Sequence, residues 1–202
     1  MKMDYFINRA TNWDTPRRIS MANHFVNALL EHVEPKSHWK GMEIGAGTGL
    51  VGLQLLQKVR SMVLVDTSVK MLDVLKKKIK GVKNVEIVSS EVTDYQVRDI
   101  DFVFSNMSFH HIEDIPATLE HVYKITQPNA VMVIGDLRSE DGSFHQFDPV
   151  PHRGFDTDEL SEWVENAGFS VKSVNTYNVL KRERMQGKIS EYEQFILVAE
   201  RK

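Results

Sequence analysis

The sequence predicts one α/β domain built on a mostly parallel β-sheet. Two observations support this prediction: short apolar runs alternate with helical patterns from Met42 onward, and a glycine-dense turn directly follows the first apolar run. Strands that are separated by helical segments form βαβ units, in which the strands pair in parallel. With 202 residues the chain can bury one substantial core but is too short for two ordinary domains.

Each expected element shows the periodicity of its type. The apolar runs that predict strands cover residues 42–44, 62–65, 85–88, 102–104 and 131–134. Apolar residues at helical spacing predict helices between these strands, over residues 50–56, 68–80 and 119–123. A further helix is predicted before the first strand, from apolar residues that recur at helical spacing: Met21, Phe25, Ala28, Leu29 and Val33.

The last helix is marked at both ends. Asp156 is a suitable N-cap, Glu159 stands three residues later as a capping-box partner, and Gly168 stops the helix. Two β-rich runs follow, over residues 169–180 and 195–199, with too few residues between them for a helical crossover. We therefore expect these two strands to pair antiparallel at the end of the sheet.

The composition is that of an ordinary globular protein, with 42% apolar residues, 26% charged residues and a net charge of −3. This net charge gives no broad attraction to a phosphate backbone, so we expect no nucleic-acid partner. The one basic cluster, in residues 76–83, has the spacing of a solvated helix face. The chain contains no cysteine, which excludes disulfides, thiolate metal sites and a cysteine nucleophile.

No apolar stretch reaches the length of a signal peptide or of a membrane span. The sequence therefore predicts a cytoplasmic protein without a membrane span, and it favours no particular oligomeric state.

The strongest chemical signal is the turn after the first strand, where Gly45, Gly47 and Gly49 alternate with other residues. Glycines at such a turn adopt positive φ and let the backbone approach a ligand closely. The helix that follows offers free N–H groups to an anion.

A nicotinamide site is the main alternative, because residues 47–52 also satisfy the G-x-G-x-x-G pattern. This pattern begins two residues later than the end of the strand allows. Glu43, inside the strand, is also hard to explain in such a site, since a buried carboxylate is costly without a partner. A ligand that carries an ammonium group would supply that partner.

Asp66 ends the second strand, about twenty residues after the glycines, and is placed to bind two ribose hydroxyls. The alternative role is a cap for the helix over residues 68–80. Thr67 or Ser68 could serve as that cap, which would leave Asp66 free for a ligand.

These residues resemble the class I S-adenosylmethionine-dependent methyltransferases, and the resemblance extends over nearly the whole chain. It implies a Rossmann-like, seven-stranded, mostly parallel sheet with an antiparallel last strand and helices on both faces. It also implies S-adenosylmethionine as the cofactor. Residues 1–40 are then an N-terminal lid or cap segment, and residues 41–202 are the S-adenosylmethionine-binding methyltransferase domain, the two forming one domain overall.

The resemblance also assigns roles to single residues. The glycine turn would cradle the methionine part of the cofactor, Glu43 would help to hold its amino end, and Asp66 would bind the ribose. Glu91 would approach the adenine amino group, and the remaining contacts would come from Ala46 in the turn, from Thr67 and Val92 beside the adenine ring, and from Asn106 and Met107 in the methionyl pocket.

Residues 10–14 resemble the first segment of quinone-biosynthesis-type (UbiE-like) C-methyltransferases, where such a segment covers the cofactor as a lid. Tyr5, Trp13, Arg138 and His145 are the expected lid or substrate residues. For Trp13, packing within the protein remains an equal alternative.

Several subclasses do not fit. The Pro-Pro-aromatic element of amino-methylating DNA enzymes is missing after the fourth strand, and cytosine-C5 and arsenic methyltransferases need cysteines. Catechol-type enzymes hold magnesium with acids after strands four and five. Asp136 could be one of these acids, but Asn106 and Leu137 do not complete the set.

His110 and His111 are the candidate catalytic residues, one packing under the cofactor and the other pointing toward the substrate. We expect no metal site, because neighbouring side chains point apart and no third ligand is apparent. His145 and His152 are alternative substrate-facing histidines, since loops at this strand end carry function in open α/β sheets.

The predicted function is methyl transfer from S-adenosylmethionine to a small molecule by in-line displacement. The sulfonium already activates the methyl group, so alignment of the nucleophile is the main contribution of the protein. The alternatives are an NAD(P)-dependent oxidoreductase and a non-catalytic S-adenosylmethionine-binding protein.

Overall fold

The computed structural model describes residues 10–147, 149–185 and 187–202. Its elements before the fourth strand are η1 (Ala10–Asn12), α2 (Pro16–His32), β1 (Lys40–Ile44), α3 (Gly52–Leu55), η2 (Leu56–Lys58), β2 (Ser61–Val65), α4 (Val69–Lys78), β3 (Val85–Val88) and η3 (Val92–Asp94). The later elements are β4 (Ile100–Asn106), η4 (Phe109–His111), α5 (Ile115–Ile125), β5 (Thr126–Leu137), η5 (Ser143–His145), α6 (Thr157–Asn166), β6 (Phe169–Met185) and β7 (Lys188–Arg201).

The strands form one seven-stranded sheet in the order β3-β2-β1-β4-β5-β7-β6. The pairs from β3 to β5 are parallel, whereas β7 pairs antiparallel with both β5 and β6. The prediction of a Rossmann-like, mostly parallel sheet with an antiparallel last strand is therefore confirmed. The order reverses direction beside β1 and β4, so loops that leave the carboxyl ends of these strands open a crevice there.

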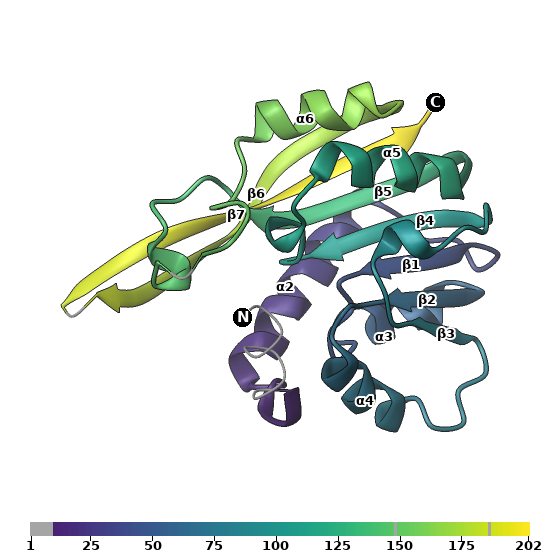
Figure 1. The fold of residues 1–202 in the computed structure, drawn as a ribbon, viewed down its shortest axis with the longest axis horizontal. Helices are drawn as coiled ribbons and strands as arrows, with labels where there is room; N and C mark the ends of the chain where they lie inside the picture. Colours follow the sequence, from purple (N-terminus) through teal and green to yellow (C-terminus); the bar gives the residue numbers. More distant parts are fainter. Residues whose placement is uncertain (1–9, 148, 186) are drawn as a thin grey trace.

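Helices cover both faces of the sheet (Figure 1). Helices α5 and α6 pack on one face around buried side chains such as Leu119 and Leu160, and α2, α3 and α4 pack on the other around Phe25, Leu55 and Leu72. Within the described residues, no helix has both the length and the apolar character that a bilayer crossing requires.

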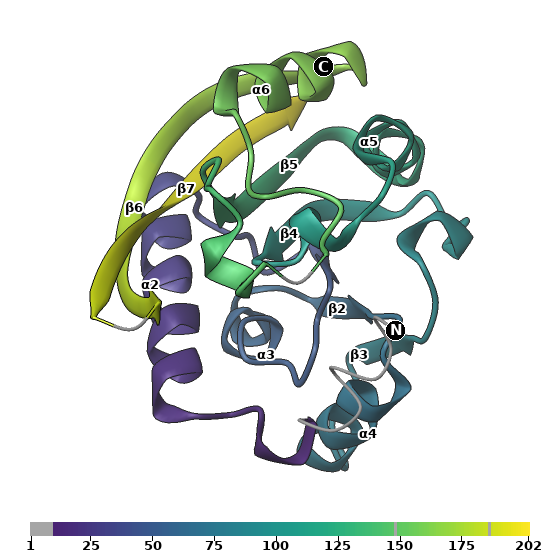
Figure 2. The same ribbon diagram turned by 60° about the vertical axis from the view of Figure 1, so that its left-hand side comes forward.

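The strands β6 and β7 form a long hairpin whose far end extends beyond the rest of the sheet (Figures 1 and 2). The sequence predicted only residues 169–180 and 195–199 of it. The extension was missed because it lacks an apolar run: it is stabilised instead by backbone pairing and by cross-strand partners such as Lys181 and Glu191.

The helix ends follow the expected capping chemistry. The side chain of Thr15 accepts a hydrogen bond from the Arg18 N–H, and Pro16 begins α2. Asp156 accepts hydrogen bonds from two N–H groups of the first turn of α6, as predicted. Gly168 follows with a φ of +106°, a value that favours glycine.

The predicted helix over residues 50–56 is the poorest match. It is reduced to the four residues of α3 and the single turn η2. Only glycine fits at position 52 of α3, because a Cβ there would overlap the Glu43 carboxylate and the Leu64 side chain. Close packing of this segment on β1 and β2 therefore outweighs its helical periodicity.

Gly135 in β5 lies directly under the ring of Phe25, which is fully buried. A Cβ at this position would overlap the ring, so we expect Gly135→Ala to lower the free energy of unfolding by about 1–3 kcal/mol, as overpacked core substitutions do. Urea denaturation measures this change. In a Phe25→Leu background the same alanine is expected to be much less destabilising, and equal losses in both backgrounds would contradict the overlap.

Candidate functional site

The turn after β1 is shaped by its glycines. Gly45, Gly47 and Gly49 have φ values of +74°, +54° and +82°, which non-glycine residues rarely adopt. A Cβ on Gly45 would overlap Ser108, and one on Gly49 would meet Leu75, whereas no atom of the described residues lies within 4 Å of the corresponding position on Gly47. Gly45 and Gly49 are therefore fixed by packing, and the backbone at Gly47 faces open space that a ligand can enter.

Glu43 lies in β1 with only 3% of its surface exposed. Its carboxylate accepts a hydrogen bond from the Gly52 N–H at 2.9 Å. Burial raises the pKa of Glu43 well above its usual value, and the nearby Asp66 adds to the rise, although the Gly52 hydrogen bond opposes it. The sequence argument that Glu43 needs a ligand ammonium as its partner was thus incomplete, because Gly52 is a partner within the protein.

Asp66 connects the turn that follows β1 with the segment that follows β2. Its Oδ2 accepts a hydrogen bond from the Gly47 N–H and its Oδ1 accepts one from the Ser68 N–H, both at 2.7 Å. Burial raises its pKa, while these two hydrogen bonds oppose the rise. The expectation that Asp66 is free was wrong in this respect, since Ser68 makes no side-chain cap and Asp66 binds its N–H instead. Each carboxylate oxygen still has a lone pair for a further donor.

The strands β2 and β3 pair in parallel, so their carboxyl ends lie at the same edge of the sheet. Thr67 follows β2 there, and Glu91 and Val92 follow β3. The side chains of Thr67 and Glu91 are exposed. Val92 is different, because it begins η3 and is 4% exposed within the core. Two of the three predicted adenine contacts are thus open to a ligand, and the third is an apolar side chain at the edge of the core.

Asn106 and Met107 lie at the end of β4. Met107 has a φ of +54°, a strained conformation for a non-glycine residue, and its N–H donates to the Gly135 carbonyl at 2.7 Å. The Tyr177 hydroxyl donates to the Asn106 Oδ1 at 3.3 Å, and the Gln194 amide donates to the Met107 sulfur at 2.9 Å. Tyr177 and Gln194, from β6 and β7, were not predicted from the sequence.

The N-terminal segment is attached to the glycine turn through Asp14. The Asp14 carboxylate accepts a hydrogen bond from the Thr48 hydroxyl and pairs with the Lys78 ammonium, both at 2.5 Å. Trp13, which is half-buried, is covered on one ring face by the Arg18 guanidinium at 3.7 Å. Tyr5, the other predicted lid residue, lies outside the described residues.

Three histidines converge at the ends of β4 and β5. The ring centroids of His110 and His111 are 4.1 Å apart, and those of His110 and His145 are 4.9 Å apart. The expectation that neighbouring histidines point apart was wrong because they lie in the 3-10 turn η4, where successive side chains diverge less than in a strand. The expected lack of a third imidazole was also wrong, because η5 brings His145 to this place.

Asp136 fixes the orientation of His110. Both residues are buried, and the Asp136 Oδ1 lies 2.7 Å from the His110 Nδ1. The carboxylate also accepts hydrogen bonds from the backbone N–H groups of His110 and Leu137. Burial alone would raise the Asp136 pKa, but the charge and hydrogen bond of His110, together with these N–H groups, hold it below its usual value. An ionised carboxylate only accepts, so the His110 Nδ1 carries the proton of this hydrogen bond.

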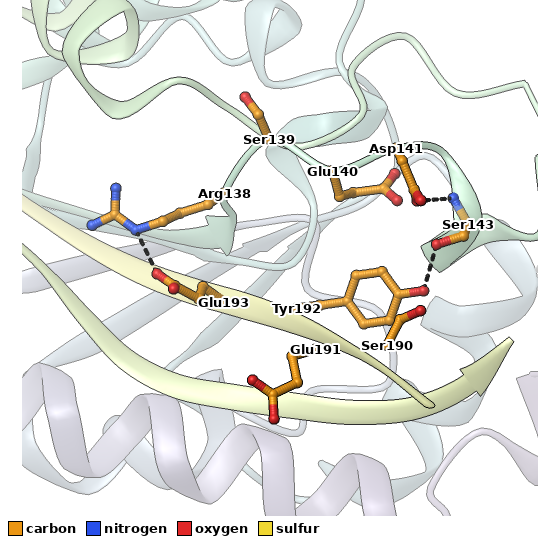
Figure 3. A pocket seen from close by; sticks show the side chains of 9 residues that line it. All are labelled: Arg138, Ser139, Glu140, Asp141, Ser143, Ser190, Glu191, Tyr192 and Glu193. Carbon is orange, nitrogen blue, oxygen red and sulfur yellow. Dashed lines mark hydrogen bonds and ion pairs between the residues drawn. The ribbon is translucent and has the colours of Figure 1, made fainter. Parts of the chain in front are cut away.

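The loop that carries His145 is anchored on the β6–β7 hairpin (Figure 3). The Glu140 Oε2 accepts hydrogen bonds from the N–H groups of Gly142 and Phe144, and the Ser143 hydroxyl lies 2.6 Å from the Tyr192 hydroxyl. The Phe144 ring meets the edge of the Tyr192 ring. The two contacts with Tyr192 come from β7, so the hairpin helps to position His145.

Arg138 lines a polar cleft of about 340 Å³ between this loop and β7. Its guanidinium pairs with Glu193 at 3.3 Å (Figure 3). It also donates hydrogen bonds to the hydroxyls of Thr157 and Thr176. None of the predicted cofactor-binding residues lines this cleft. Arg138 thus lies beside the loop of His145, with its side chain bonded to β6, β7 and the start of α6.

Similarity to known proteins agrees with this geometry. Residues 42–134 match the family described as "Methyltransferase domain". An uncharacterized methyltransferase of Oceanobacillus iheyensis is 27% identical over 154 residues, 73% of this chain and 70% of that protein. A malonyl-[acyl-carrier protein] O-methyltransferase of Ilyobacter polytropus is 27% identical over 93 residues, 45% of this chain and 35% of that protein. A solved S-adenosylmethionine-dependent methyltransferase from Aquifex aeolicus has the same fold, with a TM-score of 0.70 and 21% identity over 96% of this chain and 97% of that one.

The contacts of Asp14 predict that its removal loosens the N-terminal segment. We expect Asp14→Ala to speed amide exchange in residues 10–15 about fivefold, because partly exposed contacts of this kind contribute about 1 kcal/mol. Hydrogen–deuterium exchange with mass spectrometry measures the effect. The matched control is Asp73→Ala, which removes an exposed pair with Lys76 at 3.8 Å. Equal exchange in the two variants would show that Asp14 does not hold the segment.

Proposed function

The chain is a class I S-adenosylmethionine-dependent methyltransferase, and we propose that it methylates a small-molecule acceptor by in-line displacement at the sulfonium. The observation that best supports the cofactor part of this proposal is the hydrogen bond between the Gly47 N–H and the Asp66 carboxylate. The backbone at Gly47 faces open space, and beside it Asp66 accepts the Gly47 N–H and keeps acceptor capacity for two ribose hydroxyls.

The cofactor then extends along the carboxyl edge of the sheet. Asp66 binds the ribose, and the glycine turn with Ala46 contacts the methionyl part. Glu43 supports this turn through its hydrogen bond with the Gly52 N–H. The adenine lies toward Thr67, Glu91 and Val92. Asn106 and Met107 would meet the methionyl part from β4, and the direction of this strand then brings the sulfonium toward His110 and His111.

Residues 1–40 act as a lid or cap on the domain formed by residues 41–202, in the manner of the UbiE-like enzymes. The attachment of Asp14 to Thr48 and Lys78 supports this role, because it places the N-terminal segment against the glycine turn. Trp13, next to Asp14, would cover the cofactor. Exclusion of water by such a lid strengthens the electrostatic interactions inside the site.

Methyl transfer from a sulfonium requires alignment above all. Holding the acceptor in line with the methyl–sulfur bond can contribute about 7–11 kcal/mol to lowering the barrier. His110 and His111 are the catalytic candidates, because they lie at the end of β4 where the methyl group would be. His145, with Arg138 in the neighbouring loop, would contact the acceptor.

A small acceptor is favoured by the charge of the protein and by its relatives. A net charge of −3 does not attract a nucleic-acid backbone, and the lack of cysteine suits a cytoplasmic protein. The relative from Ilyobacter polytropus is named as an O-methyltransferase of malonyl-[acyl-carrier protein], a substrate that is not a nucleic acid.

The proposal is tested by ligand binding and by turnover. S-Adenosylhomocysteine should raise the melting temperature of the protein, and NAD(H) should not. Incubation with S-adenosylmethionine and a panel of metabolites should release S-adenosylhomocysteine for at least one acceptor. Stabilisation by NAD(H) alone would contradict the proposal, and cofactor binding without turnover on any acceptor would favour a non-catalytic binding protein.

The ribose contact predicts a specific loss of affinity. Asp66→Ala should weaken S-adenosylhomocysteine binding at least tenfold, about 1.4 kcal/mol, as measured by isothermal titration calorimetry. Because Asp66 also holds the Gly47 and Ser68 N–H groups, the 2′,3′-dideoxy analogue of the ligand is the control. Wild-type protein should bind this analogue more weakly than the parent ligand, and the variant should bind both alike. Unchanged affinity in the folded variant would exclude the ribose role.

A further inference from the structure

The three histidines His110, His111 and His145 offer ligand atoms that all lie within 4.8 Å of one another. Their rings come from two loops at the ends of β4 and β5, and one is buried and two are half-buried. We propose that these imidazoles bind a divalent transition-metal ion, with Zn²⁺ as the best match. A zinc ion at ordinary Zn–N bond lengths needs nitrogen atoms about 3.3 Å apart, so the three side chains would rotate toward one another on binding.

The strongest support is the way in which Asp136 holds His110. Histidines that bind metals almost always donate their second ring N–H to a carboxylate or carbonyl, which fixes the ring and its tautomer. The Asp136 carboxylate accepts the His110 Nδ1–H at 2.7 Å and is itself held by the N–H groups of His110 and Leu137. A metal ion would therefore bind His110 through its other ring nitrogen, Nε2, in the deprotonated form.

His145 is placed by a loop that is well anchored. The Glu140 carboxylate and the Asp141 carboxylate accept backbone N–H groups at the start of η5. Ser143 binds the Tyr192 hydroxyl from β7. A loop held at this many points brings its imidazole to a defined place, as a metal site with ligands from separate segments requires.

The chemistry of the donors selects the ion. Imidazole suits Zn²⁺, Co²⁺ and related ions, whereas Mg²⁺ and Ca²⁺ prefer oxygen ligands. Three protein ligands leave one position open on a tetrahedral ion, which is the arrangement of a catalytic rather than a structural zinc site. The ion would therefore present its open position to a ligand from outside.

The place of this site also suggests a substrate class, a step that rests on the proposed function. His110 and His111 follow Asn106 and Met107 by only a few residues, so the ion would lie on the acceptor side of the sulfonium. An alcohol or thiol bound to the ion would release its proton to solvent more readily. Its oxygen or sulfur would then form a bond to the methyl carbon while the methyl–sulfur bond of the cofactor breaks, the electron pair of that bond passing to the departing sulfur.

Metal binding can be measured without any knowledge of the acceptor. Chelator-treated full-length protein is titrated with Zn²⁺ by calorimetry, and Co²⁺ is added separately for its visible absorption, which is strong in tetrahedral sites. Wild-type protein should bind one equivalent of Zn²⁺, and Mg²⁺ should not compete. His145→Ala should weaken zinc binding at least a hundredfold, and Asp136→Asn by 10–100-fold because it removes the support of His110. The control variants His24→Ala and His38→Ala remove exposed histidines and should bind like wild-type.

Two results would overturn the proposal: no stoichiometric zinc binding by folded wild-type protein, or binding that His145→Ala leaves unchanged. Each variant is also titrated with S-adenosylhomocysteine, which His145→Ala should still bind. Asp66→Ala should lose the nucleoside and keep the metal. Failure of the metal site therefore leaves the nucleoside result intact, and failure of the proposed function leaves the zinc result intact.

Discussion

The carboxyl edge of this sheet is organised by the need to compensate buried carboxylates. Removing such a group from water is costly unless hydrogen bonds or charges replace the lost solvation. Glu43 receives the Gly52 N–H, Asp66 receives the Gly47 and Ser68 N–H groups, and Asp136 receives two backbone N–H groups and an imidazole. Each carboxylate thus fixes backbone N–H groups at the carboxyl edge of the sheet: Glu43 in α3, Asp66 in the turn after β1 and before α4, and Asp136 in η4 and at the end of β5.

The same bonds connect neighbouring loops. Asp66 holds the turn after β1 to the start of α4, and Asp14 adds the N-terminal segment to this pair through Thr48 and Lys78. On the other side, Asp136 connects β5 with η4. The glycine-turn side and the histidine side of this edge are therefore built in the same way, although different strands carry them.

The sequence predicted those parts of the site that depend on local chemistry. Gly45, Gly47 and Gly49 follow directly from the need for positive φ after a buried strand, and an acid at the end of the second strand marks Asp66. The histidine cluster could not be predicted in this way, because His145 reaches His110 only through the path of the loop after β5. One signal could have indicated the pairing of Asp136 with His110. It is an acid at the end of an apolar strand, in a chain where two adjacent histidines follow the preceding strand.

The β6–β7 hairpin accounts for much of what the sequence did not reveal. Tyr177 from β6 binds Asn106, and Tyr192 from β7 binds Ser143 next to His145, so one hairpin contacts both the end of β4 and the loop after β5. The contacts of Glu43, Asp66 and Gly47, by contrast, come entirely from the first two strands and their loops. Substitutions in the hairpin can therefore alter the end of β4 and the loop of His145 without changing these contacts.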